Sequence, residues 1–211
     1  MPAYALAIFD FDGTLADSFP WFCSVLDQTA DKFGLDHVRP EDIPNLRELS
    51  SRDALKRLGV PFYKLPAIST FMRGLAVEGI PHIPMFAGAA EALAALQAGG
   101  VRLALVSSNA EAAVRAVLGP AAELIDRYAC GSSLFGKSRK FAAVLDTLGV
   151  LRDDAIAIGD EIRDIDAARK THLAAGSITF GYNSRDALER HHPDYLFDSY
   201  QQLVEAVLSK A

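Results

Sequence analysis

Two aspartates near the N-terminus, Asp10 and Asp12, stand where a buried strand would end, in the string FDFDGTLADS of residues 9–18. The preceding run, YALAIF, is nearly all apolar, which is typical of strands covered on both faces. If the chain stays extended, its alternation aims both carboxylates to one side. Gly13 then permits a turn, and the Thr14 hydroxyl can donate to a carboxylate or a phosphate. An ordinary acidic turn would explain a lone Asp-Gly pair, but it explains the whole string poorly.

A second acidic cluster follows a later apolar run, in IAIGDEIRDIDAA of residues 156–168. Asp160 comes directly after that run, and Gly159 lets the backbone bend. Asp164 lies four residues further on, so the two carboxylates share a helix face if the helix begins early enough. Acidic residues also favour helix N-termini, so this cluster alone would be a modest indication.

Adjoining strand ends would bring the two clusters together and concentrate negative charge. Two carboxylates about 4 Å apart repel by roughly 4 kcal/mol at an effective dielectric constant near 20. They would therefore raise each other's pKa values or require a cation. Oxygen ligands without a nearby His or Cys favour magnesium over zinc. The predicted Mg²⁺ ligands are Asp10, Asp12, Asp160 and Asp164.

Small polar residues could complete the site as phosphate ligands. The run VRLALV of residues 101–106 ends at Ser107, Ser108 and Asn109. Hydroxyls and the free amides of a following helix suit phosphate oxygens. The alternative is that these residues are simply a helix N-cap.

A lysine at the start of another predicted helix is a further candidate. In GKSRKF, residues 136–141, a lysine would oppose the helix dipole unless an anion balances it. Lys137 and Lys140 compete for this role, and a solvated surface lysine is the alternative for either. Lys137 is preferred because it follows Gly136 at the turn.

The apolar runs predict a doubly wound α/β sheet. Strands are expected at 4–9, 101–106, 155–158 and 177–180, with helices at 88–98, 110–118 and 138–148. Residues 17–85 break this alternation, since they show helical patterns at 18–33, 51–58 and 66–77 and end in the proline-rich return IPHIPMFAG. A helical insertion there would lie over the carboxyl ends of the strands, where open α/β sheets bind ligands. We therefore predict a catalytic core of residues 1–16 and 86–211 and a helical cap of 17–85, with a structural side domain as the alternative.

Composition excludes several classes of protein. Half of the 211 residues are hydrophobic, which is too many for a disordered chain, and the net charge of -6 gives no support for a nucleic-acid partner. Neither a signal peptide nor a membrane-spanning stretch is apparent, so a cytoplasmic protein is expected. The two cysteines, Cys23 and Cys130, are far apart and are expected to be reduced.

The motifs together resemble the haloacid dehalogenase superfamily, near its phosphoglycolate-phosphatase-like members. FDFDGTL, a strand-end serine, a lysine and GDEIRD occur in the family's order and span nearly the whole chain. The resemblance implies a Rossmann-like parallel sheet with helices on both faces and an inserted all-helical cap. It also implies Mg²⁺-dependent hydrolysis of a small phosphate monoester through a phospho-aspartate, with phosphoglycolate-like substrates favoured.

The same resemblance assigns roles to individual residues. Asp10 would be the nucleophile, Asp12 the general acid and base, and Asp160 a metal ligand supported by Asp164. Ser107 and Lys137 would be phosphate ligands. One departure is Glu161, at a position where close relatives often have a small hydroxyl residue.

Asp12 favours phosphoryl transfer within the superfamily, because resembling enzymes that cleave carbon–halogen or carbon–phosphorus bonds lack this aspartate. A sugar-phosphate mutase is the alternative in the same superfamily. A signalling module resembling response-regulator receivers would also phosphorylate an aspartate, but its acceptor is not in a DFDGT string. A non-catalytic binding protein would not need the intact acidic residues and lysine.

The sequence indicates the substrate only coarsely. A cap over the site suggests a small phosphorylated metabolite. Arg47, Ser51 and Arg52 of the insertion could reach its second anionic group, although a solvated helix face is the alternative. No nucleic acid or membrane partner is expected, and the chain is predicted to be a monomer or homodimer.

Overall fold

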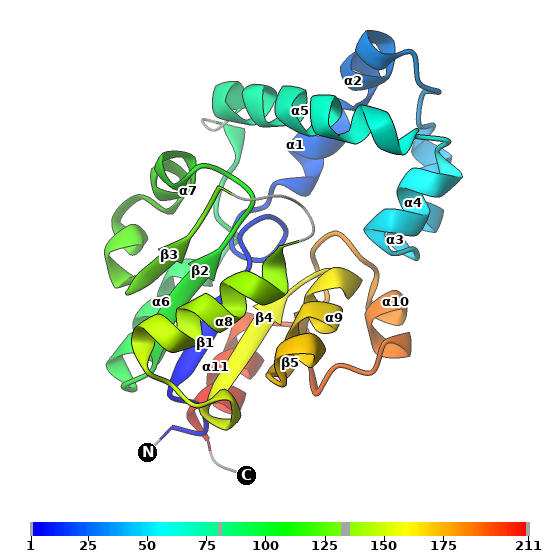
Figure 1. Cartoon of the computed structure of the whole chain (residues 1–211). Coiled ribbons are helices and arrows are strands. Elements are labelled where there is room, and N and C mark those ends of the chain that lie inside the picture. The colour runs from blue at the N-terminus through cyan, green and yellow to red at the C-terminus, as the bar shows by residue number, and fades with distance from the viewer. Residues whose placement is uncertain (1, 80–81, 132–135, 210–211) are drawn as a thin grey trace.

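A six-stranded parallel sheet forms the centre of the computed structural model, which describes residues 2–79, 82–131 and 136–209 (Figure 1). Its strand order is β3-β2-β1-β4-β5-β6, and every neighbouring pair is parallel. The strands are β1 (Leu6–Phe9), β2 (Arg102–Val106), β3 (Arg127–Ala129), β4 (Ala155–Gly159), β5 (Ala174–Ile178) and β6 (Tyr195–Phe197). The predicted α/β class with a parallel sheet is therefore confirmed.

Helices cover both faces of the sheet and a further group lies beyond its carboxyl edge. Those after the insertion are α6 (Ala89–Ala98), α7 (Glu111–Leu118), α8 (Lys137–Leu148), α9 (Ile162–Thr171), α10 (Arg185–Arg190) and α11 (Tyr200–Leu208). Those of the insertion are α1 (Phe19–Ser24), α2 (Leu26–Phe33), α3 (Ile43–Arg47), α4 (Ser51–Arg57) and α5 (Leu65–Gly79). Short 3-10 helices span Pro40–Asp42, Phe62–Lys64, Gly119–Leu124 and Arg152–Asp154.

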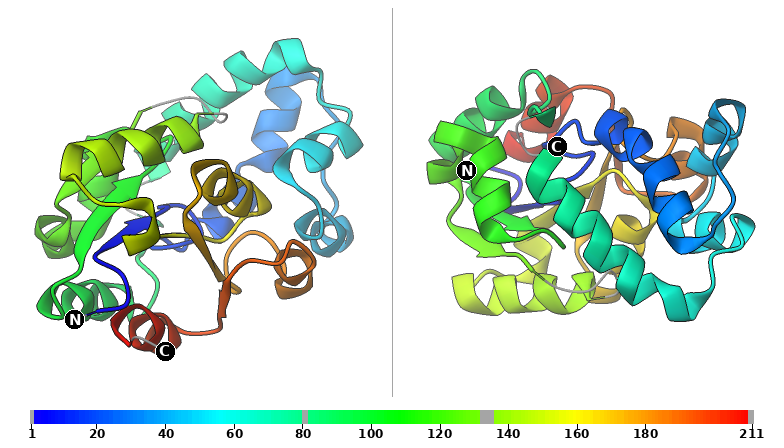
Figure 2. Two further views of the ribbon diagram at one scale, coloured as in Figure 1. Left: turned by 60° about the horizontal axis from the view of Figure 1, so that its bottom comes forward. Right: turned by 90° about the horizontal axis from the view of Figure 1, so that it is seen from above.

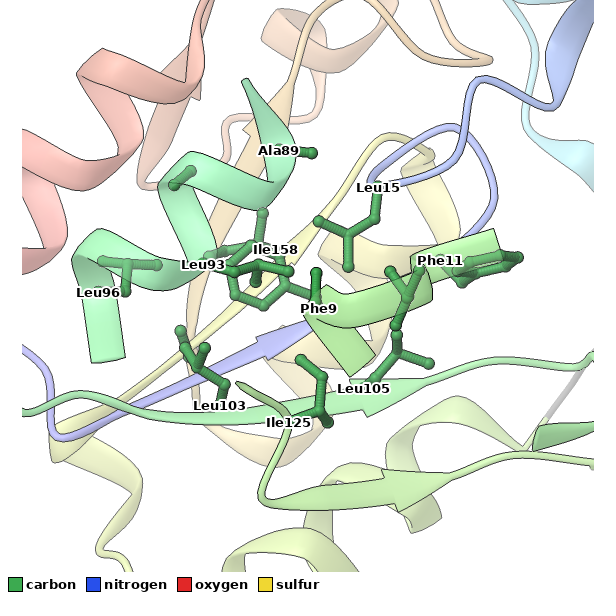
Figure 3. Close-up of a cluster of buried hydrophobic side chains, with 14 of the residues drawn as sticks. Phe9, Phe11, Leu15, Ala89, Leu93, Leu96, Leu103, Leu105, Ile125 and Ile158 are labelled. Carbon is green, nitrogen blue, oxygen red and sulfur yellow. The ribbon is translucent and has the colours of Figure 1, made fainter. Parts of the chain in front are cut away.

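The alternation of β1 divides the core into two layers. Ala7 and Phe9 point to the face covered by α6, α7 and α11, where Phe9 packs with Leu93 (Figure 3). Leu6 and Ile8 point to the opposite face, covered by α8, α9 and α10. All four side chains are fully buried, which is why the run is apolar at every position.

The helices α1–α5 form the predicted insertion, and no strand occurs within residues 17–79. Figures 1 and 2 show them as one group above the carboxyl edge of the sheet. The chain enters and leaves this group side by side, because Phe86 donates its amide to Leu15 and Asp17 donates to Pro84. These contacts support our proposal of a core of residues 1–16 and 86–211 and a cap of 17–85. Residues 80 and 81 of the predicted proline-rich return lie outside the described residues.

Three local predictions were inaccurate. The predicted helix 18–33 is two helices separated at Val25, where the Ser24 hydroxyl donates to the Trp21 carbonyl and competes with the helical pattern. The short edge strands β3 and β6 were not predicted, and the strand expected at 177–180 is β5, which begins at Ala174.

Among the described residues, no helix combines the length and the hydrophobicity that a membrane span requires. The cytoplasmic location stays a prediction.

Candidate active site

Strand β1 delivers Asp10 to the carboxyl edge of the sheet, where its amide still donates to Ile158 of β4. The chain then turns sharply, because the amides of Thr14, Leu15 and Ala16 all donate to the carbonyl of Phe11. The turn predicted at Gly13 is therefore confirmed, whereas the orientation of Asp10 and Asp12 to one side by strand alternation stays a prediction.

Gly13 makes this turn compatible with a close approach to β4. Its φ of +72° lies in the left-handed region, and a Cβ atom built on it would be 2.1 Å from Oδ2 of Asp160. The Thr14 hydroxyl donates to Oδ1 of Asp160 at 2.6 Å, and the amide of Tyr182 donates to Oδ2 at 2.7 Å. The β1 turn and the loop after β5 thus fix the Asp160 carboxylate from two sides.

Three buried carboxylates converge at this point. Oxygen atoms of Asp10, Asp160 and Asp164 lie within 4.8 Å of one another. Asp160 precedes α9, which begins at Ile162, so the predicted shared helix face was wrong. The side chain of Asp164 nevertheless reaches the segment before α9, because its Oδ2 accepts the main-chain amides of Asp160 and Glu161 at 3.1 and 3.0 Å.

The carboxylate of Asp12 lies outside this group, although it was predicted as a metal ligand. Its Oδ2 accepts a hydrogen bond of 2.8 Å from the side-chain amide of Asn109. The Asp12 side chain lines a cavity between the sheet and the cap. Asp12 thus faces the space from which a substrate would enter.

Lys137 supplies positive charge to the carboxylates. Its Nζ is 2.6 Å from Oδ2 of Asp10 and also pairs with Asp164. Lys140, the competing lysine, donates instead to the carbonyls of Ser107 and Ala129, both at 2.5 Å. Of the two candidates, the structure therefore places Lys137 beside Asp10.

The surroundings shift the pKa values of these acids in different directions. Burial raises the pKa of Asp10, although Lys137 opposes the shift, and raises the pKa of Asp12 to about 6 with help from the charge of Asp10. Burial and then the neighbouring acids raise the pKa of Asp160 well above its usual value. Burial would raise the pKa of Asp164 too, but Lys137 and Arg163 hold it lower.

The predicted phosphate ligands lie next to these acids. Ser107 is buried directly after β2, and its hydroxyl accepts the amide of Asn109 at 3.0 Å. Asn109 does not cap α7, whose N-cap residue is Ala110, and the Asn109 side chain donates to Asp12 instead. Ser108 and Asn109 line the cavity together with Asp12.

The cavity has a volume of about 410 Å³ and is lined by residues of the core edge and of the cap helices. Arg47 lines it, but its guanidinium donates to the carbonyls of Tyr182 and Gly181 at 3.0 and 2.8 Å and lies over the ring of Phe19. Arg52 is exposed and does not belong to the lining. Of the two predicted arginines, the structure therefore places Arg47 at the cavity and Arg52 outside its lining.

Sequence analysis missed Arg163 and the role of Glu161. Arg163 pairs with Glu161, and the Ser51 hydroxyl of the cap donates to the same carboxylate. Both core residues line the cavity. Arg163 is the one basic residue within the acidic string GDEIRDID, and this isolation could have identified it.

Comparison with known proteins agrees with this geometry. The sequence model of the haloacid dehalogenase-like hydrolase family matches residues 7–176. A phosphoglycolate phosphatase of Synechococcus elongatus is 32% identical over 203 residues, covering 95% of both chains. One of Agrobacterium fabrum is 28% identical over 223 residues, covering 99% of this chain and 94% of its own.

Solved structures share the fold. A haloacid dehalogenase-like hydrolase from Streptococcus pneumoniae has a TM-score of 0.79 at 19% identity, covering 96% of this chain and 97% of its own. The chain belongs to the haloacid dehalogenase-like hydrolase family. Within that family it is a phosphatase, a hydrolase of phosphoric monoesters.

Proposed function

We propose that this phosphatase depends on Mg²⁺ and transfers the phosphoryl group of a small monoester first to Asp10 and then to water. The observation that carries the proposal is the placement of Asp10 at the end of β1, beside Lys137 and within 4.8 Å of two further carboxylates. A carboxylate nucleophile divides the displacement at phosphorus into two easier transfers.

The donor set fits a hard divalent cation. Asp10, Asp160 and Asp164 offer only oxygen atoms, which suit Mg²⁺, and their negative charge exceeds what Lys137 can balance. When bound, the ion would supply positive charge that keeps the acids ionised and attracts phosphoryl oxygens. Asp12 is left out of this ligand set and is free for proton transfer.

The chain's own residues then account for both transfers. An Asp10 carboxylate oxygen forms the new bond to phosphorus while the bond to the ester oxygen breaks. Asp12 gives its proton to that departing oxygen, then takes a proton from the water that attacks the phospho-aspartate, which releases phosphate and restores Asp10. Lys137 and the groups of residues 107–109 would hold the phosphoryl oxygens.

The substrate is a small phosphorylated metabolite in this proposal. Two relatives are phosphoglycolate phosphatases, so phosphoglycolate is the first ester to test on this chain. A sugar-phosphate mutase would instead give an isomerised product without net release of phosphate.

The test uses Asp12 variants with two kinds of ester. Wild-type protein should release phosphate from alkyl phosphates in proportion to bound Mg²⁺ and lose this activity in EDTA. Asp12→Ala should keep its fold and lose about 100- to 10,000-fold in rate, the usual contribution of a positioned acid or base.

A second experiment uses acetyl phosphate, whose leaving group needs no proton. With this substrate, Asp12→Asn should accumulate phosphate on Asp10. Near-wild-type turnover by Asp12→Ala would remove Asp12 from the mechanism, and phosphate trapped on another residue would remove Asp10.

A further inference from the structure

The loop after β5 is packed tightly around the carboxylate of Asp160. Gly181 lies so close to it that a Cβ atom built on this glycine would collide with the Asp160 side chain. The next amide, that of Tyr182, donates to Oδ2 of Asp160 at 2.7 Å, and the amide of Asn183 donates to the main-chain carbonyl of Asp160 at 3.3 Å. Any shift of this loop would therefore withdraw a donor from the Asp160 carboxylate or press against it.

A residue of the cap holds the same loop from its other side. Arg47, at the end of α3, donates from Nε to the carbonyl of Tyr182 at 3.0 Å and from Nη2 to the carbonyl of Gly181 at 2.8 Å. The main-chain carbonyl of Arg47 accepts from the amide of Ser184 at 3.0 Å. Because the guanidinium is a rigid planar fork, it fixes the two loop carbonyls in one orientation.

A single peptide unit joins Arg47 to Asp160. The peptide between Gly181 and Tyr182 accepts from Arg47 at its carbonyl oxygen and donates to Asp160 at its N–H. Since the peptide is planar, a rotation that moves the carbonyl also moves the N–H. A cation at the carbonyl end also polarises the peptide and strengthens the hydrogen bond at the opposite end. The peptide thus couples the position of Arg47 to that of the Asp160 carboxylate.

We propose that Arg47 is a positioning residue for the magnesium site, because it holds the Gly181–Tyr182 peptide so that Asp160 presents its carboxylate to the cation. The inference rests on the proposed binding of Mg²⁺ by Asp10, Asp160 and Asp164. Arg47 acts through the loop and needs no contact with the ion or with the substrate. Groups that orient metal ligands in this way typically contribute about 10- to 100-fold to metal affinity.

The direction of the effect distinguishes positioning from simple charge. The positive charge of Arg47 repels a nearby cation, so its removal alone would tighten the binding of Mg²⁺. Loss of the hold on the peptide would weaken that binding instead. We therefore expect Arg47→Met to bind Mg²⁺ about 10- to 100-fold more weakly than the wild type.

Isothermal titration calorimetry with MgCl₂ and the substrate-free full chain would measure this Kd. Arg57→Met, at an exposed position of α4, is the matched control and should keep the wild-type Kd. Arg47→Lys keeps the charge and loses the fork, so its Kd should lie between those of the wild type and Arg47→Met. In initial-rate assays with phosphoglycolate, Arg47→Met should need more Mg²⁺ for half-maximal rate, and excess MgCl₂ should restore kcat.

The outcomes separate this inference from the proposed function. An unchanged or lower Kd for Mg²⁺ in Arg47→Met would overturn the positioning role, and a raised KM for phosphoglycolate at that unchanged Kd would give Arg47 a contact with the substrate instead. If the wild-type chain bound no Mg²⁺, the proposed function would fail, and this inference with it. If thermal melting showed that Arg47→Met does not fold, a wild-type Kd in Arg47→Lys would overturn the proposal.

Discussion

At the scale of single residues, the three buried carboxylates differ in the charge of the groups that contact them. Lys137 contacts Asp10 and Asp164, whereas the hydrogen-bond donors to Asp160 are the neutral Thr14 hydroxyl and the Tyr182 amide. The pKa of Asp160 is accordingly raised and that of Asp164 lowered. Asp160 is therefore the acid whose charge costs most in the absence of a cation.

Replacing Asp160 by asparagine should stabilise the metal-free protein and abolish its response to magnesium. The side chain keeps its shape and can still accept from the Tyr182 amide, while the buried charge disappears. We expect the melting temperature in EDTA to rise by roughly 2–4 °C for each kcal/mol gained. The increase caused by Mg²⁺ should vanish, whereas Asp166→Asn on the exposed side of α9 should behave as wild type. A full magnesium response in Asp160→Asn would place the cation elsewhere.

The two lysines of α8 should separate catalysis from stability. Lys137→Met leaves Asp10 and Asp164 buried without their partner, which typically costs about 3–5 kcal/mol. It should also lower kcat by about 100- to 1,000-fold, as loss of a charge-stabilising donor does. Lys140→Met removes two hydrogen bonds to carbonyls and should cost about 1–3 kcal/mol with a smaller loss of rate. Urea denaturation would measure the unfolding free energy of each variant, and initial-rate assays would measure its kcat. Equal losses of kcat in Lys137→Met and Lys140→Met would contradict a separate catalytic role for Lys137.

At the scale of elements, one wall of the cap is fastened to the core. Asn183 is buried in the loop after β5 and donates to the carbonyls of Arg47 and Leu49 at 2.7 and 2.8 Å. Its Oδ1 accepts the amide of Ile162 at the start of α9. Arg190 adds an ion pair with Glu48. The end of α3 and the start of α4 are therefore held against the same loop that supports Asp160.

Changes at Asn183 should loosen this connection. Asn183→Ala leaves one amide and two carbonyls without their partner, and we expect a loss of about 1–3 kcal/mol in unfolding free energy. Asn183→Asp should cost more, because it turns a carboxylate oxygen toward two carbonyls. Urea denaturation would measure both, with Asn45→Asp on the exposed side of α3 as the control. Wild-type stability of Asn183→Asp would show that this contact does not hold the cap.

Strands could be predicted where a buried apolar run is uninterrupted, whereas β5 is equally buried but contains Gly176 and Ser177 and was expected to begin at 177 instead of 174. Strands β1, β2 and β4 are buried along most of their length, so their apolar runs stand out in the sequence. Strands β3 and β6 have three residues each and lie at the two edges of the sheet, so they leave little pattern. The turn at Gly13 was predicted but its hydrogen bonds were not, because one carbonyl that accepts three amides leaves no periodic signal.

At the scale of the whole molecule, sequence order could predict the meeting of distant acids but not their exact partners. Asp10 and Asp160 each follow a buried strand, and β1 and β4 are neighbours in the sheet. The carboxyl ends of parallel strands share one edge, so their convergence follows from the fold class. Contacts such as Ser51 with Glu161 join the cap to the core across 110 residues, and only the folded arrangement reveals them.

This convergence couples the stability of the whole chain to magnesium. A cation that binds the folded site and not the unfolded chain stabilises the fold by about 2.7 kcal/mol at a concentration 100 times its Kd. For a chain of this length we expect the melting temperature to rise by roughly 5–10 °C. Differential scanning calorimetry with MgCl₂, against NaCl of equal ionic strength, would measure the specific part of the rise. Equal effects of the two salts would mean that Asp10, Asp160 and Asp164 do not share a cation, because screening alone would then explain the stabilisation.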